Sequence, residues 1–317
     1  MAKSKIDLSD PSVKFAIELY GNRASVAAQV AASKDAAVRP IYALNARTDR
    51  VEQVGSCVLL AIADQVFALS ASHVFDAVGA YRPLIGCGAQ LHPLPGDRFS
   101  SSPGPSGTHR DDPVDASVFH ITAAIPDEIR DSALAIDDLD ILPSDREKDF
   151  FVATGYRNSQ SKSTAKGHMA TLDGYPTVEL NTDHYEHWEL DRNRHLLLAS
   201  EDEMLLNMKW QKAPSIRGLS GGAIFRIDGI HATHAAENRR TPRAKLAAIL
   251  IERRMGVRDK IFPAIVGTRL GVHFGLIHKY LPDLYLDEIL AEECQHQSLD
   301  SSVTSHSDIR HGSGMEG

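Results

Sequence analysis

The segment Arg217-Gly-Leu-Ser-Gly-Gly-Ala-Ile-Phe225 combines three glycines, one serine and the start of an apolar run. Gly218 permits a backbone turn that a side chain would obstruct, and it leaves its N–H free to point inward. The N–H groups of Gly218 and Ser220 can then converge on a developing oxyanion, which contributes roughly 3–4 kcal/mol per donor in enzymes that use it. Taken alone, the segment also fits a glycine-rich turn between two strands of a β protein.

Two upstream segments supply the other residue types of a nucleophilic site. The apolar run Gln65–Ser70 leads through small residues to His73, which would stand at the rim of a β-barrel. Asp115 opens the apolar run Ala116–Ile121, where a carboxylate can accept from a histidine N–H and fix the tautomer. Asp112 is the alternative acid, and Asp115 is preferred because the strand begins directly after it. Each residue alone is more commonly an ordinary histidine or a turn aspartate.

In the order histidine, aspartate, serine, these segments resemble the trypsin-like serine peptidases of the chymotrypsin fold. Ser-Ala-Ser-His73 resembles that family's Thr-Ala-Ala-His, and Asp115-Ala-Ser-Val resembles its Asp-Ile-Ala-Leu. Gly218-Leu-Ser-Gly-Gly resembles its Gly-Asp-Ser-Gly-Gly. The resemblance covers about residues 37–282 and implies a nucleophile at Ser220, a general base at His73 and an orienting carboxylate at Asp115. It also implies that Gly218 and Ser220 form the oxyanion hole.

Two short segments resemble the bacterial, non-secreted members of that family. Gly155-Tyr-Arg-Asn158 is similar to their Gly-Tyr/Phe-Pro turn, and the run Val266–Gly271 is similar to their ending. Leu219 departs from the family, because digestive and clotting enzymes have an aspartate there that pairs with the new amino terminus after zymogen cleavage. Leucine forms no ion pair, so the order of the oxyanion loop must come from packing, a partner or a ligand.

The substrate pocket departs from the trypsin type as well. The acidic residue that trypsin-type members carry six positions before the serine is Pro214 here, so a preference for Lys or Arg is not supported. The run Leu246–Ile251 aligns with the strand that lines the primary pocket, which would leave Glu252 or Arg253 at its rim. A surface salt bridge is the competing role for both residues.

Short apolar runs separated by turn signals predict an antiparallel β-barrel rather than a βαβ sheet. The resemblance implies an all-β fold of two six-stranded antiparallel β-barrels, to which this chain adds an N-terminal helix and a C-terminal helix. The helices are expected at Pro11–Ala32, Gly271–Leu281 and Tyr285–Glu293, and the stretch Gly96–Pro113 is expected to be a long polar loop. We divide the chain into a helical extension (1–36), a first barrel with the histidine and aspartate (37–124), a connector (125–147), a second barrel with the serine (148–282), and a C-terminal helix with a disordered tail (283–317).

Composition limits the partners. The chain has 317 residues, 34 basic and 42 acidic side chains and a net charge of −8, with no basic stripe, so nucleic acid is not an expected partner. No segment reaches the roughly 18 apolar residues of a membrane span, and the N-terminus lacks a signal-peptide pattern. The three cysteines are too scattered for a disulfide framework. These features predict a cytoplasmic protein that binds no membrane.

Neither a cofactor nor a metal site is expected. His184 with His187, and His231 with His234, have His-x-x-His spacing but no clear carboxylate or thiolate companion. Solvated loop histidines are the better interpretation of both pairs.

The sequence therefore predicts a serine endopeptidase that hydrolyses a protein or peptide substrate through an acyl-enzyme. A trypsin-like enzyme in the cytoplasm needs restraint, so we expect a narrow or regulated activity, as in bacterial defence or stress signalling, with a regulatory protein as a further partner. The alternative is a catalytically silent peptidase fold that serves as a binding or regulatory module. A hydrolase with a nucleophile elbow fits poorly, because no βαβ pattern surrounds Ser220 and the histidine comes first in the chain.

Overall fold

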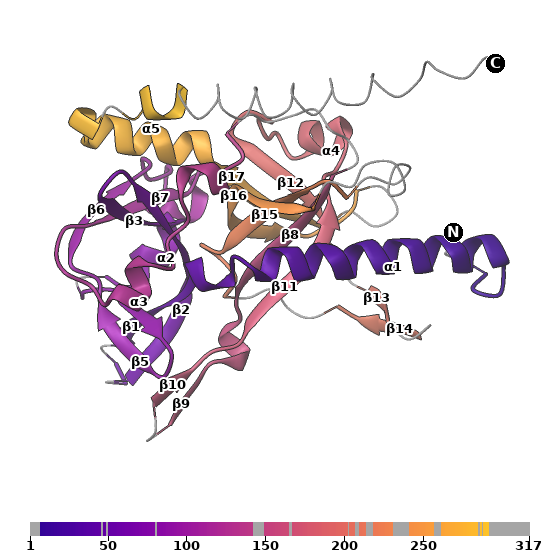
Figure 1. The fold of residues 1–317 in the computed structure, drawn as a ribbon, viewed down its shortest axis with the longest axis horizontal. Coiled ribbons are helices and arrows are strands. Elements are labelled where there is room, and N and C mark those ends of the chain that lie inside the picture. The colour runs from indigo at the N-terminus through magenta and orange to yellow at the C-terminus, as the bar shows by residue number, and fades with distance from the viewer. Residues whose placement is uncertain are drawn as a thin grey trace, which may run out of the picture.

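The computed structural model describes residues 7–45, 47–48, 50–79, 81–141, 149–164, 167–201, 203–206, 209–213, 218–230, 241–256, 261–284, 286 and 288–291. Two antiparallel sheets form the body, one from each half of the chain, and helices lie on their outside (Figure 1). Two curled antiparallel sheets with few helices are the architecture expected of the chymotrypsin-like fold, and that expectation is confirmed.

The first sheet has seven strands in the order β5-β4-β1-β2-β3-β7-β6. Its edge strands β5 and β6 are separated in the chain only by Leu94 and Pro95. Two residues span at most about 10 Å, so the two edges of the sheet must approach each other and the sheet must curl. The first sheet therefore has one strand more than predicted, because the chain on either side of Leu94 and Pro95 adds one strand to each edge. The strands are β1 (Val38–Asn45), β2 (Arg50–Ile62), β3 (Gln65–Ala71), β4 (Leu84–Cys87), β5 (Gln90–Pro93), β6 (Gly96–Ser100) and β7 (Ala116–Ile121).

The second sheet has six strands in the order β11-β8-β15-β16-β17-β12. Its edges also meet, because Leu180 N–H donates to the Leu197 carbonyl at 2.9 Å beside an antiparallel bridge between Glu179 and Leu198. The strands are β8 (Phe150–Tyr156), β11 (Leu172–Val178), β12 (His195–Ala199), β15 (Ala223–Asp228), β16 (Arg243–Arg254) and β17 (Ala264–Arg269). Two small ribbons complete the described strands: β9 (Lys162–Thr164) with β10 (Gly167–Met169), and β13 (Glu203–Leu206) with β14 (Lys209–Lys212).

Five α-helices are described: α1 (Pro11–Ala32), α2 (Ser72–Asp76), α3 (Asp127–Arg130), α4 (Thr182–His187) and α5 (Leu270–Tyr280). Short 3-10 helices occur at Asp35–Ala37, His109–Asp111, Ile136–Asp138, Asn158–Gln160 and Pro282–Leu284. The sequence predicted α1 and α5 to within one residue at each end but did not predict α4. The expected segment Tyr285–Glu293 is helical at 286 and 288–291, and its remaining residues lie outside the described part.

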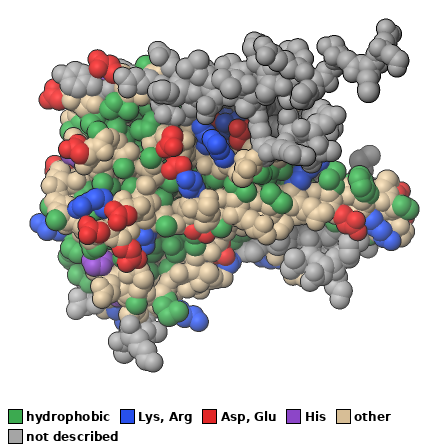
Figure 2. All heavy atoms as spheres, in the orientation of Figure 1, with side chains coloured by type: hydrophobic (Ala, Val, Ile, Leu, Met, Phe, Trp, Pro, Cys, Tyr) green, Lys and Arg blue, Asp and Glu red, His purple; other side chains and the backbone are tan. Residues whose placement is uncertain are grey.

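Helix α1 is part of the packed body. Asp10 caps it by accepting from Ser12 N–H at 2.8 Å, and Pro11 occupies the first turn. Ala27 and Ala31 are buried against the second sheet, where α1 contacts β8 and β11. The other end of the helix projects beyond the sheet and carries hydrophobic side chains next to charged ones (Figures 1 and 2). Binding of a regulator or a substrate to this helix stays a prediction.

The prediction of one long polar loop at Gly96–Pro113 was wrong. Its first residues form β6, an edge strand that pairs with β7 from Gly96↔Ile121 to Ser100↔Ser117. The sequence concealed this strand because it is exposed or half-buried along its length and Phe99 is its only apolar side chain. Further along, His109 is buried with its Nδ1 2.8 Å from Asp76 Oδ2, and Arg98 Nη2 donates to Asp76 Oδ1 at 2.9 Å. These contacts tie the loop to α2.

The central strands of the first sheet are buried on both faces. On β2, Val58 and Leu60 enter a cluster shared by both sheets, α1 and α5, while Cys57 and Leu59 enter a second cluster built mostly from the first sheet. Successive side chains of a strand point to opposite faces, so a strand between two clusters becomes a continuous apolar run. This explains why the sequence predicted these strands well.

No helix in the described part of the chain is both long and apolar enough to cross a membrane. The expected domain limits at 36, 124, 147 and 282 stay predictions.

Burial of His273 on α5 couples stability to pH. The residue is fully buried, its Nε2–H donates to the Ser70 carbonyl at 3.3 Å, and burial lowers its pKa to about 4. An unfolded histidine has a pKa near 6.5, so between about pH 6.5 and pH 4 this side chain is protonated in the unfolded state and neutral in the folded state. The stabilising effect is therefore complete above about pH 6.5 and is lost as the pH falls toward 4.

We expect the His273→Gln variant, whose amide can keep the donor to Ser70, to lose less stability on acidification. Its free energy of unfolding should fall between pH 7 and pH 5 by about 2 kcal/mol less than that of the wild type, as measured by urea denaturation. His278→Gln, at an exposed site on the same helix, is the control. Identical pH dependence in all three proteins would contradict this linkage.

Candidate active site

The first sheet holds His73 against Asp115. His73 lies on α2 directly after β3, Asp115 precedes β7, and these two strands pair up to Ala71↔Ala116. The His73 N–H donates to Asp115 Oδ1 at 2.9 Å, and the ring Nδ1 lies 2.5 Å from Oδ2. Asp115 itself has a φ of +44°, in the left-handed region that few non-glycine residues adopt. The sequence prediction that these two residues meet corresponds to this contact.

The surroundings of the pair set its chemistry. Asp115 is only 5% exposed, and burial raises the pKa of its carboxyl group, while the hydrogen bonds from His73 oppose that rise. The His73 side chain is 36% exposed and lines a cavity. A carboxylate that accepts from Nδ1–H leaves Nε2 as the basic nitrogen of the ring. The arrangement can therefore take a proton at Nε2 and stabilise the resulting imidazolium.

The alternative acid, Asp112, does not contact the histidine. Its carboxylate accepts from Ser101 Oγ at 2.5 Å and from Val114 N–H at 2.9 Å. Both bonds shape the turn that leads into β7.

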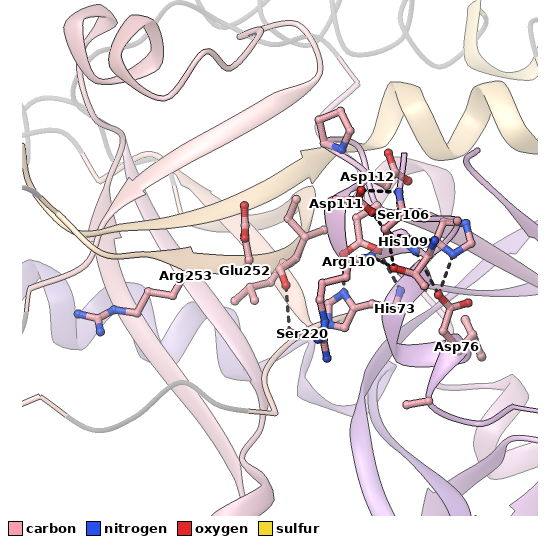
Figure 3. A pocket seen from close by; sticks show the side chains of 18 of the residues that line it. His73, Asp76, Ser106, His109, Arg110, Asp111, Asp112, Ser220, Glu252 and Arg253 are labelled. Carbon is pink, nitrogen blue, oxygen red and sulfur yellow. Dashed lines mark hydrogen bonds and ion pairs between the residues drawn. The ribbon is translucent and has the colours of Figure 1, made fainter. Parts of the chain in front are cut away.

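Ser220 lies on the same cavity from the side of the second sheet (Figure 3). Its hydroxyl donates to the Ile251 carbonyl at 3.0 Å. Within the described residues no hydrogen bond joins this hydroxyl to His73. Serine χ1 has three staggered wells, so the hydroxyl is redirected by rotation about a single bond. The structure thus brings His73 and Asp115 into contact and leaves Ser220 beside them with its hydroxyl turned to β16.

The turn that carries Ser220 is held by buried backbone contacts. Ser56 on β2 is fully buried, and its N–H donates to the Ser220 carbonyl at 2.8 Å, which joins the two sheets. Gly221 has a φ of +82°, and a Cβ there would lie 2.0 Å from the Ser56 carbonyl oxygen. Gly221 N–H donates to the Leu250 carbonyl at 2.7 Å, so the turn is tied to β16 as well. A side chain at Gly221 is excluded by both conformation and space.

The N–H groups predicted to form an oxyanion hole have no acceptor among the described residues. These are the N–H groups of Gly218, with a φ of +95°, and of Ser220. Between them Leu219 is fully buried and packs on Gly155, where an added Cβ would lie 2.9 Å from the leucine Cδ2. Leu219 is therefore held by apolar packing and needs no ionic partner.

The cavity has a volume of about 1590 Å³ and runs between the two sheets. Glu252 and Arg253 line it, but both are engaged within β16 and its surroundings, and their predicted place at a substrate pocket stays a prediction. Glu252 Oε1 accepts from Arg254 Nε at 2.7 Å, and Arg253 Nε donates to Ser200 Oγ at 2.9 Å. Pro214 lies outside the described residues, so its predicted place at the pocket is not described.

Ser56 is the contributor that sequence reasoning missed. Its side chain accepts from Tyr156 N–H at 3.0 Å and donates to the Gly218 carbonyl at 3.4 Å. The available signal was a single serine near the start of the apolar run Gly55–Ile62. Its partners lie 100 or more positions away, and nothing in the local pattern identifies them.

Across the described part of the chain, no group of three or more histidine, cysteine, aspartate or glutamate side chains could hold a metal ion. His184 and His187 lie on α4, while His231 and His234 fall outside the described residues.

Among comparisons with known proteins, only the comparison with solved structures finds a match. No family model matches the chain, and no curated protein matches it. Among solved structures, the chain is similar to neuropsin, a serine protease expressed in the limbic system of mouse brain. The sequence identity is 13%, the TM-score is 0.49, and the match covers 77% of this chain and 94% of the neuropsin chain.

We expect Gly221→Ala to destabilise the protein strongly. Alanine adopts the left-handed conformation at a cost of about 1–2 kcal/mol, and the overlap with Ser56 adds a cost of about 1–3 kcal/mol, so the free energy of unfolding should fall by roughly 3 kcal/mol. Gly88→Ala is the matched control, because Gly88 also has a positive φ (+56°) but open space at its Cβ position. Equal losses for the two variants in denaturation experiments would refute the role of the Ser56 contact.

Proposed function

We propose that this protein is a serine endopeptidase that hydrolyses peptide bonds of a protein substrate, with Ser220, His73 and Asp115 as its catalytic residues. The observation that carries the proposal is the His73–Asp115 pair on one sheet with Ser220 on the same cavity from the other sheet. A histidine oriented by a buried carboxylate beside a serine is the arrangement that activates a hydroxyl for acyl transfer.

Acylation begins when the Ser220 hydroxyl turns from Ile251 to His73. Nε2 of His73 takes the hydroxyl proton while Oγ forms a bond to the carbonyl carbon of the scissile peptide, whose oxygen receives the π electron pair. Asp115 holds Nδ1–H and stabilises the positive charge on the ring. The tetrahedral intermediate collapses as the C–N bond breaks, and His73 returns the proton to the leaving amine.

Deacylation repeats these steps with water. His73 removes a proton from water as the water oxygen attacks the ester carbon, and the proton then goes to Ser220 Oγ as the acid product leaves. In both halves the negative oxygen is stabilised by the N–H groups of Gly218 and Ser220, which lack other acceptors among the described residues. No metal or cofactor is needed for this chemistry.

The proposal extends to substrate and setting. A large cavity with charged residues of both signs supports a polypeptide substrate of narrow choice, with Glu252 and Arg253 near its recognition surface. A cytoplasmic site of action belongs to the same proposal, and the similarity of Gly155–Asn158 to non-secreted family members supports a bacterial regulated enzyme, for example in defence or stress responses. A regulatory protein partner belongs to the same proposal.

The competing function is a catalytically silent fold used for binding or regulation. The hydrogen bond from Ser220 Oγ to Ile251 favours it, because a hydroxyl held there is not aligned with the base.

Reaction with a fluorophosphonate probe distinguishes the two functions. We expect the wild-type chain to form a Ser220–phosphonate ester with loss of fluoride, and Ser220→Ala to remain unlabelled, as detected by intact-protein mass spectrometry. Labelling of the isolated chain supports a constitutive enzyme of narrow specificity, while labelling that requires cell extract supports a regulated one. Absence of labelling under both conditions would rule out the peptidase and leave the silent module.

The two neighbouring aspartates allow a matched comparison. Asp115→Asn should slow fluorophosphonate labelling by roughly 10⁴-fold, because an amide cannot accept from Nδ1–H and so favours the wrong tautomer. Asp112→Asn keeps the Oδ1 acceptor for Val114 N–H and places an amide NH2 that can donate to Ser101 Oγ. It should change the rate by less than about threefold, since no hydrogen bond joins Asp112 to His73 among the described residues. The reverse ranking of the two rates would transfer the role to Asp112.

A further inference from the structure

Gly218 is in contact with a turn from a different part of the second sheet. A Cβ at Gly218 would lie 2.1 Å from Asn158 Oδ1 and 2.5 Å from Asn158 N. The turn at Asn158–Gln160 therefore forms a wall against the residue whose N–H is assigned to the oxyanion hole. Any movement of that wall changes the space in which the Gly218 peptide adopts its left-handed conformation.

The turn is anchored by residues immediately before Asn158. Arg157 makes two bonds to Asp173 on β11, from Nε to Oδ2 at 2.5 Å and from Nη2 to Oδ1 at 2.9 Å. Only 14% of the arginine side chain and 20% of the aspartate side chain are exposed. Tyr156 is fixed as well, because its carbonyl accepts from Gln53 Nε2 at 2.7 Å. A planar, two-bond ion pair fixes direction as well as distance, unlike a single salt bridge.

The same segment also receives the residue that precedes the nucleophile. Leu219 packs on Gly155, and Asn158 lies against Gly218, so residues 155–158 contact two successive positions of the nucleophile turn. An ion pair from the residue before the serine cannot order this turn, since that residue is a buried leucine. The 155–158 segment instead adds contacts at Gly218 and Leu219 to those that Ser56 and β16 make with the turn.

We propose that Arg157, Asp173 and Asn158 are positioning residues for the oxyanion hole: the Arg157–Asp173 ion pair fixes the turn whose Asn158 holds Gly218 in place. This inference rests on the proposed peptidase function and names how the site is kept in its active form. None of the three residues touches the reacting atoms. Their effect should therefore appear in the rate of the chemical step rather than in the binding of a ligand.

Saturation kinetics with a small fluorophosphonate test the inference, because its phosphoryl oxygen occupies the oxyanion position during attack by Ser220. We expect Asp173→Asn and Arg157→Gln to lower the limiting rate of phosphonylation about tenfold each, with an unchanged half-saturation concentration and complete final labelling. The double variant should lose no more than either single variant, as expected of residues that act as a unit. Asp173→Glu should recover part of the rate.

Two further variants guard against trivial effects. Asn158→Ala changes an exposed side chain with little risk to folding, and it should lower the limiting rate severalfold. Asp127→Asn breaks the exposed Asp127–Arg130 pair and should leave the rate unchanged. Wild-type rates in Asp173→Asn and Asn158→Ala, with Ser220→Ala unlabelled, would overturn the inference and leave the peptidase standing. A wild-type chain that never reacts would overturn both.

Discussion

The hydrogen bond from the Ser56 N–H to the Ser220 carbonyl is the contact on which the site depends, because it joins the sheet that holds His73 and Asp115 to the sheet that holds Ser220. His73 and Asp115 are fixed to each other within one sheet, so their geometry does not need the second. Ser220 is tied to β16 of its own sheet, so its place beside His73 depends on the contact between the two sheets. A buried amide that found no acceptor would cost about 1–3 kcal/mol, so the pairing of the sheets and the placing of the serine are favoured together.

Around this bond the nucleophile turn is stabilised by neutral packing and by a remote ion pair. Gly221 allows the backbone to pass at contact distance from Ser56, and Leu219 fills the space above Gly155. These contacts are made by uncharged groups and need no ionic partner at Leu219. Restraint of the activity would then fall on the hydroxyl of Ser220, which is bonded to Ile251.

The sequence predicted the parts of the structure that are encoded locally. The central strands of both sheets have continuous apolar runs because both their faces are buried, and His73 and Asp115 were identified from the ends of such runs. Strand β6 was missed because an edge strand with polar side chains resembles a loop. Ser56 and the Arg157–Asp173 pair depend on partners brought close only by the curling of the sheets, and the orientation of the Ser220 hydroxyl depends on a single torsion that no pattern records.

Helix α1 has a consequence for how such a chain can be controlled. Ala27 and Ala31 have small side chains, which allows the helix backbone to lie close to β8 and β11 and to cover the second sheet. Cleavage within the helix would expose apolar side chains of the second sheet and would weaken the sheet that carries Ser220. Removal of this helix would therefore cost the second sheet part of its apolar packing.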